Sequence, residues 1–166
     1  MKICKIIIGQ LIILLLFTSC SSPANKSSSI TAKEQCDEIV RCLNEKDSEA
    51  LESMFCNTVT SSESTDIEQQ IESAFILLAD EKIVSYEIIT GSESTSTDDG
   101  EITKLEIYPI IRPAVLSNDD EYEIYFYSYI INKKNVNNEG ISEITICDKN
   151  DNEYKMGNVS LVHPNL

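Results

Sequence analysis

The chain has 166 residues, of which 42% are hydrophobic and 25% are charged, a composition typical of one globular domain and not of a disordered chain. Its 13 basic and 28 acidic residues give a formal net charge of −15, which argues against binding to nucleic acid, because such proteins need a basic surface to displace counterions from phosphates. A single histidine excludes a metal site built from several histidines of one chain.

The N-terminal segment has the pattern of a bacterial export signal. Lys2 and Lys5 precede an apolar run over residues 6–17. Such a run spans about 18 Å as a helix, short of the roughly 30 Å hydrocarbon core, so it fits a signal peptide better than a spanning helix. The polar residues that follow, 21–29, are typical of a flexible tether and not of a charged stop-transfer segment.

The sequence Phe17-Thr18-Ser19-Cys20 resembles the lipobox of bacterial lipoproteins, in which a signal peptidase cuts before a cysteine whose thiol carries a diacylglyceryl group. The resemblance implies lipidation of Cys20, loss of residues 1–19 and anchoring at the outer face of the cytoplasmic membrane. Two acyl chains anchor a protein stably, because each buried methylene contributes about 0.8 kcal/mol. An ordinary cleaved signal and an uncleaved anchor are the alternatives. Losing two lysines and no acid would take the formal charge from −15 to −17, which favours solubility and would attract a basic partner.

Three amphipathic helices are predicted ahead of any strand. Thr31 and Glu34 have the spacing of a capping box, and the apolar pattern behind them predicts a first helix to about Lys46. Asp47 is the expected N-cap of a short second helix. A Ser/Thr-rich loop over residues 58–64 follows, and a second capping box then opens the third helix with the sequence Thr65-Asp66-Ile67-Glu68. The expected apolar faces are Ala32, Cys36, Ile39, Val40 and Leu43; Ala50, Leu51, Met54 and Phe55; and Ile67, Ile71, Ala74, Phe75 and Leu78.

From Lys82 onward the apolar period changes to two, which predicts strands. Pro109 and Pro113 imply an edge or a bulge near the end of the second strand. Residues 91–100 are polar throughout and are interpreted as a long hairpin loop. The expected strands cover residues 83–90, 102–111, 122–132 and 141–147, with a short fifth strand near Tyr154.

Helices followed by an antiparallel meander predict an α+β fold with the helices on one face of the sheet. The folded domain is expected over residues 31–160. The lipidated cysteine and tether would occupy residues 20–30, and residues 161–166 would form a tail.

The stretch from Cys42 to Phe55 (CLNEKDSEALESMF) and the later Glu139-Gly140-Ile141, together with the lipobox, resemble a family of short Gram-positive lipoproteins, domain of unknown function 5104 (DUF5104). The resemblance implies a fold similar to the nuclear-transport-factor-2-like cone, in which N-terminal helices pack on the concave face of a curved antiparallel sheet. It implies that Gly140 makes a tight turn before the fourth strand, and it implies no catalytic residue. By position, the helix-hairpin signature that serves packing and capping would be Leu43, Asp47, Leu51 and Phe55.

Four cysteines follow Cys20. Cys36 and Cys42 share the first predicted helix, where six residues of rise separate them by about 9 Å, beyond the roughly 7 Å limit between Cα atoms for a disulfide. Cys42 and Cys56 could pair across the helical hairpin, and Cys147 lies on the fourth strand. Since buried free thiols are common, structural cysteines are favoured. The chain has no C-x-x-C pair, which argues against a zinc knuckle.

The tyrosine-rich strand is the best candidate for a functional surface. Tyr125, Tyr127 and Tyr129 fall on one face by alternation, opposite a face of Ile124, Phe126 and Ile130. A tyrosine ladder outside the core would favour a protein interface, including that of a homodimer, whereas tyrosines inside the cone would offer hydroxyls to a ligand. The simplest interpretation is that cross-strand tyrosine pairs only stabilise the sheet.

No catalytic or metal-binding motif is apparent. The acidic turn over residues 148–153 differs from a calcium loop, because Glu153 replaces the required glycine and Val159 the final glutamate. His163 is expected to be an exposed residue of the tail. We therefore expect no cofactor and a non-catalytic module that binds a small ligand or a protein. A small cone-fold enzyme with an acid–base residue in an apolar pocket, and an immunity protein that binds a basic partner, are the alternatives.

Overall fold

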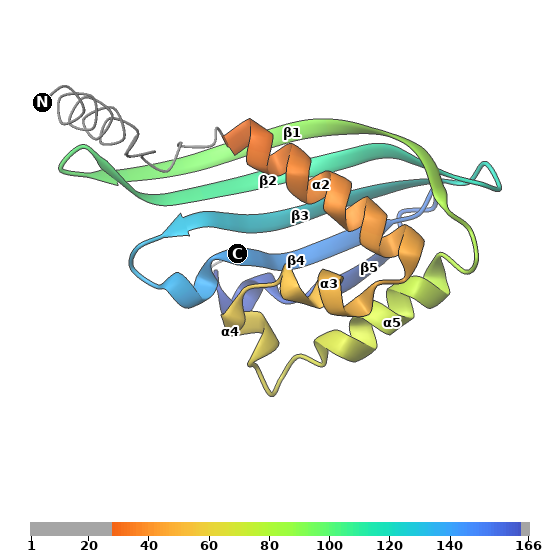
Figure 1. The fold of residues 1–166 in the computed structure, drawn as a ribbon, viewed down its shortest axis with the longest axis horizontal. Coiled ribbons are helices and arrows are strands. Elements are labelled where there is room, and N and C mark those ends of the chain that lie inside the picture. The colour runs from red at the N-terminus through yellow and green to blue at the C-terminus, as the bar shows by residue number, and fades with distance from the viewer. Residues whose placement is uncertain (1–27, 164–166) are drawn as a thin grey trace, which may run out of the picture.

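The computed structural model describes residues 28–163, in which helices cover one face of a five-stranded antiparallel sheet (Figure 1). The α+β fold class predicted from the sequence is thus confirmed. No helix among these residues is both long and apolar enough to cross a membrane. The elements are α2 (Ser28–Glu45), α3 (Ser48–Ser53), α4 (Asn57–Thr60), α5 (Ile67–Leu77), β1 (Ile83–Asp98), β2 (Glu101–Leu116), β3 (Glu121–Asn132), the 3₁₀ helix η1 (Val136–Asn138), β4 (Gly140–Cys147), β5 (Glu153–Gly157) and the 3₁₀ helix η2 (Val159–Leu161).

The longest helix, α2, begins earlier than the sequence predicted. It starts at Ser28, so Thr31 lies inside the helix and cannot be its N-cap. The Ser28 hydroxyl donates to the Glu93 carboxylate of β1, which places the first turn against the sheet. This tertiary contact extends the helix beyond the boundary that local capping indicated.

Aspartate side chains cap two of the shorter helices. The Asp47 carboxylate accepts a hydrogen bond from the Ala50 amide at 3.1 Å, as predicted. At α5 the cap is Asp66, which accepts from Gln69 at 3.0 Å, and not the expected Thr65. The loop predicted over residues 58–64 overlaps α4, a single turn whose N-cap makes no side-chain hydrogen bond. Without that local signal, α4 was not predicted.

The sheet is an antiparallel meander in which each strand pairs with the next, in the order β1-β2-β3-β4-β5. Register shifts interrupt the β1–β2, β2–β3 and β3–β4 pairs. Such irregularities bend strands and increase their twist, which gives the sheet its curvature (Figure 1). One shift lies between Ile111 and Ala114, at Pro113, where the prolines predicted a bulge.

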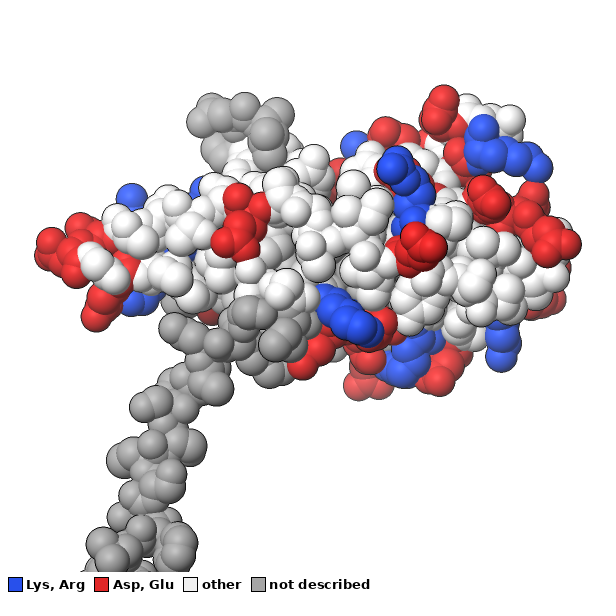
Figure 2. Space-filling model, turned by 90° about the horizontal axis from the view of Figure 1, so that it is seen from above, with Lys and Arg blue, Asp and Glu red and all other residues white. Residues whose placement is uncertain are grey.

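The first two strands form a long arm, and the predicted loop over residues 91–100 is wrong. Both strands have 16 residues and pair up to Asp98 and Glu101. Asp99 (φ 48°) and Gly100 (φ 83°) close the hairpin with the positive φ values that a type I′ turn requires. Residues 91–98 of β1 are exposed on both sides of the strand, so their sequence has no apolar alternation to reveal a strand. Acidic side chains gather at its tip (Figure 2).

The core lies between the helices and the sheet. Ile39 of α2, Ile71 of α5, Ile124 of β3 and Ile144 of β4 are all 0% exposed. Burying such a side chain contributes about 1.5–3 kcal/mol relative to leaving it in water. Aliphatic side chains dominate this layer, and Gln35 of α2 makes a polar contact across it by donating to the Ser128 hydroxyl at 3.1 Å.

The start of β4 is joined to the helical layer by main-chain hydrogen bonds. The amide of Cys56 donates to the carbonyl of Ile141 at 2.8 Å, and the amide of Ile141 donates to the carbonyl of Met54 at 2.9 Å. Gly140 has φ 116°, and a Cβ there would lie 3.0 Å from the Cys56 nitrogen. The glycine therefore serves the close approach of two main chains as well as the turn before the strand.

The four described cysteines are free thiols. Cys36, Cys42 and Cys56 are buried in the helical layer, and Cys147 at the end of β4 is half-buried. Burial raises the pKa of Cys36 to about 12, which keeps that thiol protonated and unreactive.

Candidate functional site

Tyr125 and Tyr127 of β3 project from the face of the sheet that the helices leave uncovered. Ile124 and Phe126 belong to the core, and Ser128 contacts α2, so alternate residues of β3 point towards the helices. Tyr125 and Tyr127 point the other way. Cross-strand neighbours share a face, and register pairs these tyrosines with Thr145 and Glu143 of β4.

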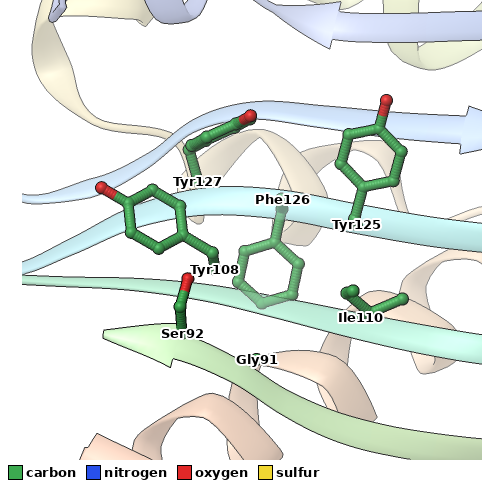
Figure 3. A pocket seen from close by; sticks show the side chains of 7 residues that line it. All are labelled: Gly91, Ser92, Tyr108, Ile110, Tyr125, Phe126 and Tyr127. Atoms are coloured by element: carbon green, nitrogen blue, oxygen red, sulfur yellow. The ribbon is translucent and has the colours of Figure 1, made fainter. Parts of the chain in front are cut away.

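Two of the three predicted tyrosines line a groove of about 420 Å³ on this face (Figure 3). Tyr108 of β2 packs edge-to-face against Tyr127, with ring centroids 5.2 Å apart and ring planes at 79°. The three half-buried tyrosines thus line one space, and none of the described residues that line it is charged. The lining consists of Gly91, Ser92, Tyr108, Ile110, Tyr125, Phe126 and Tyr127.

Gly91 lets β1 approach the groove. Its φ is 68°, and a Cβ at this position would lie 1.8 Å from the carbonyl oxygen of Tyr108. A register shift between Ile89 and Ser92 accompanies this conformation. Only glycine fits so close to β2, and the irregularity brings Ser92 beside Tyr108 at the groove (Figure 3).

Tyr129 is separated from the groove and lies in a buried polar cluster. It is 5% exposed and pairs in register with Glu106 of β2, which is 3% exposed. The Lys104 ammonium lies 3.0 Å from Glu106 Oε2 and 5.1 Å from the centroid of the Tyr129 ring. The His163 ring stacks on the Tyr129 ring, with the two ring centroids 5.1 Å apart. Of the three predicted tyrosines, Tyr125 and Tyr127 therefore line the groove, and Tyr129 belongs to the buried polar cluster.

The prediction that His163 is exposed is wrong. Its side chain is 17% exposed, its Nδ1 lies 3.4 Å from the Tyr129 hydroxyl, and its Nε2 lies 2.7 Å from Glu106 Oε1. The last contact lacks hydrogen-bond alignment, so Glu106 Oε1 has no hydrogen-bond partner among the described residues. Residues up to His163 thus belong to the folded body, although a tail was expected from Leu161.

The pKa values in this region follow from burial and neighbouring charge. Burial alone would raise the pKa of Glu106, but the Tyr129 hydroxyl and the Lys104 ammonium outweigh burial and lower it. Burial lowers the pKa of His163, and the Glu106 charge offsets this only in part, so the imidazole is neutral at pH 7. Burial and the Glu106 carboxylate raise the pKa of Tyr108 to about 12, which keeps this phenol protonated.

A second buried acid, Glu143 of β4, holds the start of the C-terminal segment. It is 6% exposed, lies 3.3 Å from the Lys155 ammonium and accepts a hydrogen bond from the Val159 amide at 3.2 Å. The Asn158 amide donates to the Ser142 carbonyl at 2.9 Å. Residues 158–163 are therefore fixed to the tyrosine-bearing face by contacts at both ends.

The described residues contain no group of three or more His, Cys, Asp or Glu side chains placed to hold a metal ion. In the acidic turn, Asp148 accepts hydrogen bonds from the amides of Asn150 and Asn152 at 2.8 and 2.9 Å. The Asn152 side-chain amide, which donates to Asp148 Oδ2 at 2.8 Å, and these two backbone bonds lower the pKa of Asp148 to about 2. The Asp148 carboxylate thus stabilises the backbone of its own turn through these hydrogen bonds.

Sequence reasoning missed Tyr108, Glu106 and Gly91. The first two alternate with apolar residues of β2, and this alternation, set beside that of β3, could have suggested a shared face. Gly91 was assigned to a loop, and only the pairing of the arm reveals its role.

Comparison with curated proteins gives no match for this chain. Residues 38–149 match the family model described as a domain of unknown function, DUF5104. This match covers the C-terminal part of α2 from residue 38 onward, α3, α4, α5, β1, β2, β3 and β4, and all of the groove residues. The chain belongs to the DUF5104 family.

Proposed function

We propose that the protein is a non-catalytic binding module that holds a small ligand in the tyrosine groove. The observation that carries the proposal is the lining, in which three half-buried tyrosines, an isoleucine and a serine surround about 420 Å³. Small-molecule sites commonly have volumes of about 300–1,000 Å³, apolar and aromatic walls, and a few polar groups that orient the ligand. A tyrosine hydroxyl can both donate and accept a hydrogen bond.

Acid–base catalysis has less support, because the buried carboxylates and the histidine of this face are engaged in other contacts. Glu106 and Glu143 are buried and contact lysines, and His163 is packed on Tyr129. None of these side chains lines the groove. A general acid at neutral pH would also need a raised carboxyl pKa, whereas the pKa of Glu106 is lowered.

A continuous aromatic interface for a homodimer has less support as well. Tyr129 is buried under His163, which leaves Tyr125 and Tyr127 as the accessible members of the strand. These two border a hollow instead of a flat patch, and a hollow suits a small ligand better than a second sheet face.

The proposal includes a lipid anchor and an extracytoplasmic location. Cys20, the predicted lipidation site, the signal peptide over residues 1–19 and most of the tether lie outside the described residues. The support is the lipobox-like sequence and the export signal before it. We also propose that the helices occupy the concave side of the sheet, as in a cone fold, because the core lies between helices and sheet.

Ligand-observed NMR with a library of small polar and aromatic compounds tests the binding proposal, using the full-length protein in detergent micelles. We expect a ligand whose affinity falls at least about tenfold in Tyr127→Leu, which removes one wall of the groove. Tyr86→Leu is the matched control, because Tyr86 is also half-buried but lies in β1 with its hydroxyl on Asp37, 2.9 Å away on α2. Equal affinities in the two variants, or no ligand at all, would contradict the proposal.

A further inference from the structure

Two of the tyrosines that line the groove, Tyr125 and Tyr108, each lie close to a carboxylate. The Tyr125 hydroxyl donates to Glu153 Oε1 at 3.2 Å. Tyr108 lies close enough to Glu106 for that carboxylate to raise the pKa of its hydroxyl, after the larger effect of burial. A hydroxyl next to a carboxylate donates electron density to its ring, which makes the ring face a better partner for a cation.

The basic groups of this face are already neutralised. Lys104 pairs with Glu106 at 3.0 Å, and Lys155 pairs with Glu143 at 3.3 Å and with Glu153 at 3.4 Å. These contacts set three carboxylates against two ammonium groups, while His163 is neutral. The local charge is therefore negative, as is that of the chain as a whole, and an anionic ligand would meet no free basic side chain among the described lining residues.

Ring geometry favours a rounded cation. The planes of Tyr108 and Tyr127 meet at 79°, so their faces form a corner, with Tyr125 farther along β3 (Figure 3). Aromatic faces attract cations held within about 6 Å of the ring centroid. The same side of the sheet already uses this interaction, because the Lys104 ammonium lies 5.1 Å from the Tyr129 centroid.

The uncharged lining selects among cations. A primary ammonium carries three N–H donors and would lose hydrogen bonds to water, because the described lining offers no carboxylate in return. A quaternary ammonium has no N–H group to satisfy, and its methyl groups suit aromatic walls. We propose that the groove binds a small free quaternary ammonium compound with a trimethylammonium head, of the choline class. This inference rests on the proposed function and adds the chemical class of the ligand.

Calorimetric titration of the full-length protein in maltoside micelles tests this inference with two ligands of the same shape. Choline carries the charge, and 3,3-dimethylbutan-1-ol replaces the charged nitrogen with carbon. We expect choline to bind at least about tenfold more tightly. Tyr127→Phe keeps an aromatic face and should retain choline binding within about threefold, whereas Tyr127→Leu should lose at least about tenfold. Circular dichroism melting of each variant shows whether the fold is intact.

The outcomes separate this inference from the proposed function. If the neutral alcohol binds as well as choline, or if only a neutral library compound binds in the groove, the inference fails and the proposed function stands. Binding to phosphatidylcholine vesicles without binding to free choline also overturns the inference, because it assigns the head group to a lipid. If no library compound and neither probe binds, both proposals fail.

Discussion

Two buried carboxylates fix the C-terminal segment to the sheet. Glu143 accepts the Val159 amide, and Glu106 lies 2.7 Å from the His163 ring at the other end. A buried carboxylate without its partners costs several kcal/mol, so each must be matched by a donor or a cation. Lys104 and Lys155 supply the cations.

His163 makes the stability of the protein depend on pH. Its folded-state pKa is lowered, chiefly by burial, so the unfolded chain takes up a proton before the folded one does. The stabilising contribution of neutral His163 is therefore complete at pH values above about 6.5, the pKa of histidine in the unfolded chain. It is lost as the pH falls towards the lower pKa of His163 in the folded protein. We expect urea unfolding to show a decline between pH 7 and pH 5.5, of at most about 1.4 kcal/mol per pH unit.

His163→Phe is the matched variant, because it keeps a flat ring for Tyr129 and removes the titration. The chain has one histidine, so the free energy of unfolding of this variant should be flat over the same interval. A decline equal to that of the unmodified protein would assign the pH dependence to other groups and contradict the geometry of the cluster.

Some of these residues could have been predicted from sequence, and others could not. The alternation in β3 placed Tyr125 and Tyr127 correctly on one face, since the strand period is two. Tyr129 shares that face, but its burial depends on a segment more than thirty residues further along the chain. The path of that segment is set by Glu143 and Ser142 on β4, which no local pattern links to Val159 or Asn158.

At the scale of elements, the structure differs from prediction mainly where tertiary contacts replace local signals. The strands β3, β4 and β5 and the cap at Asp47 follow from local patterns. Residues 91–98 of β1 do not, because Ser and Thr in an exposed strand resemble a polar loop. The Asp99-Gly100 turn was the available signal, since Asp-Gly between strands is typical of a two-residue hairpin.

Glycines of the arm provide a matched test of the β1–β2 packing. Gly91 and Gly100 both have positive φ, so alanine at either position is strained by roughly 1 kcal/mol. At Gly100 no atom lies within 4 Å of the added Cβ, whereas at Gly91 the Tyr108 carbonyl oxygen would be 1.8 Å away. We expect Gly100→Ala to lower the free energy of unfolding by about 1 kcal/mol and Gly91→Ala by more than about 2 kcal/mol. Urea denaturation measures both.

Gly91→Ala should also disturb the groove, because relief of the clash has to move β1 away from Tyr108. Tyrosine resonances of Tyr108 and Tyr127 should shift in NMR spectra of Gly91→Ala and stay in place in Gly100→Ala. Equal destabilisation of the two variants would show that the close approach at Gly91 is absent in solution.

At the scale of the whole molecule, the net charge of −15 and the uncovered groove suit a body that faces solvent on all sides. Acidic groups gather at the arm tip (Figure 2), and the described lysines and arginines mostly pair with nearby carboxylates, as Arg41 does with Glu38 at 2.7 Å. The membrane attachment that we propose is assigned to the sequence before α2. The lipobox-like sequence that ends at Cys20 supports the acyl anchor that we propose.

Mass spectrometry of protein purified from a bacterial host tests the anchor. We expect the N-terminal peptide to begin at Cys20 and to carry the mass of a diacylglyceryl group, because only a thiol can form the thioether. Cys20→Ala should lack both the cleavage at this site and the added mass. Cys4→Ala is the matched control, since Cys4 lies in the segment expected to be removed, and its mature product should be identical to that of the unmodified protein. An intact Met1, or a mature terminus at any other residue, would assign the apolar run to an uncleaved anchor or an ordinary signal peptide and would leave Cys20 as one more free thiol.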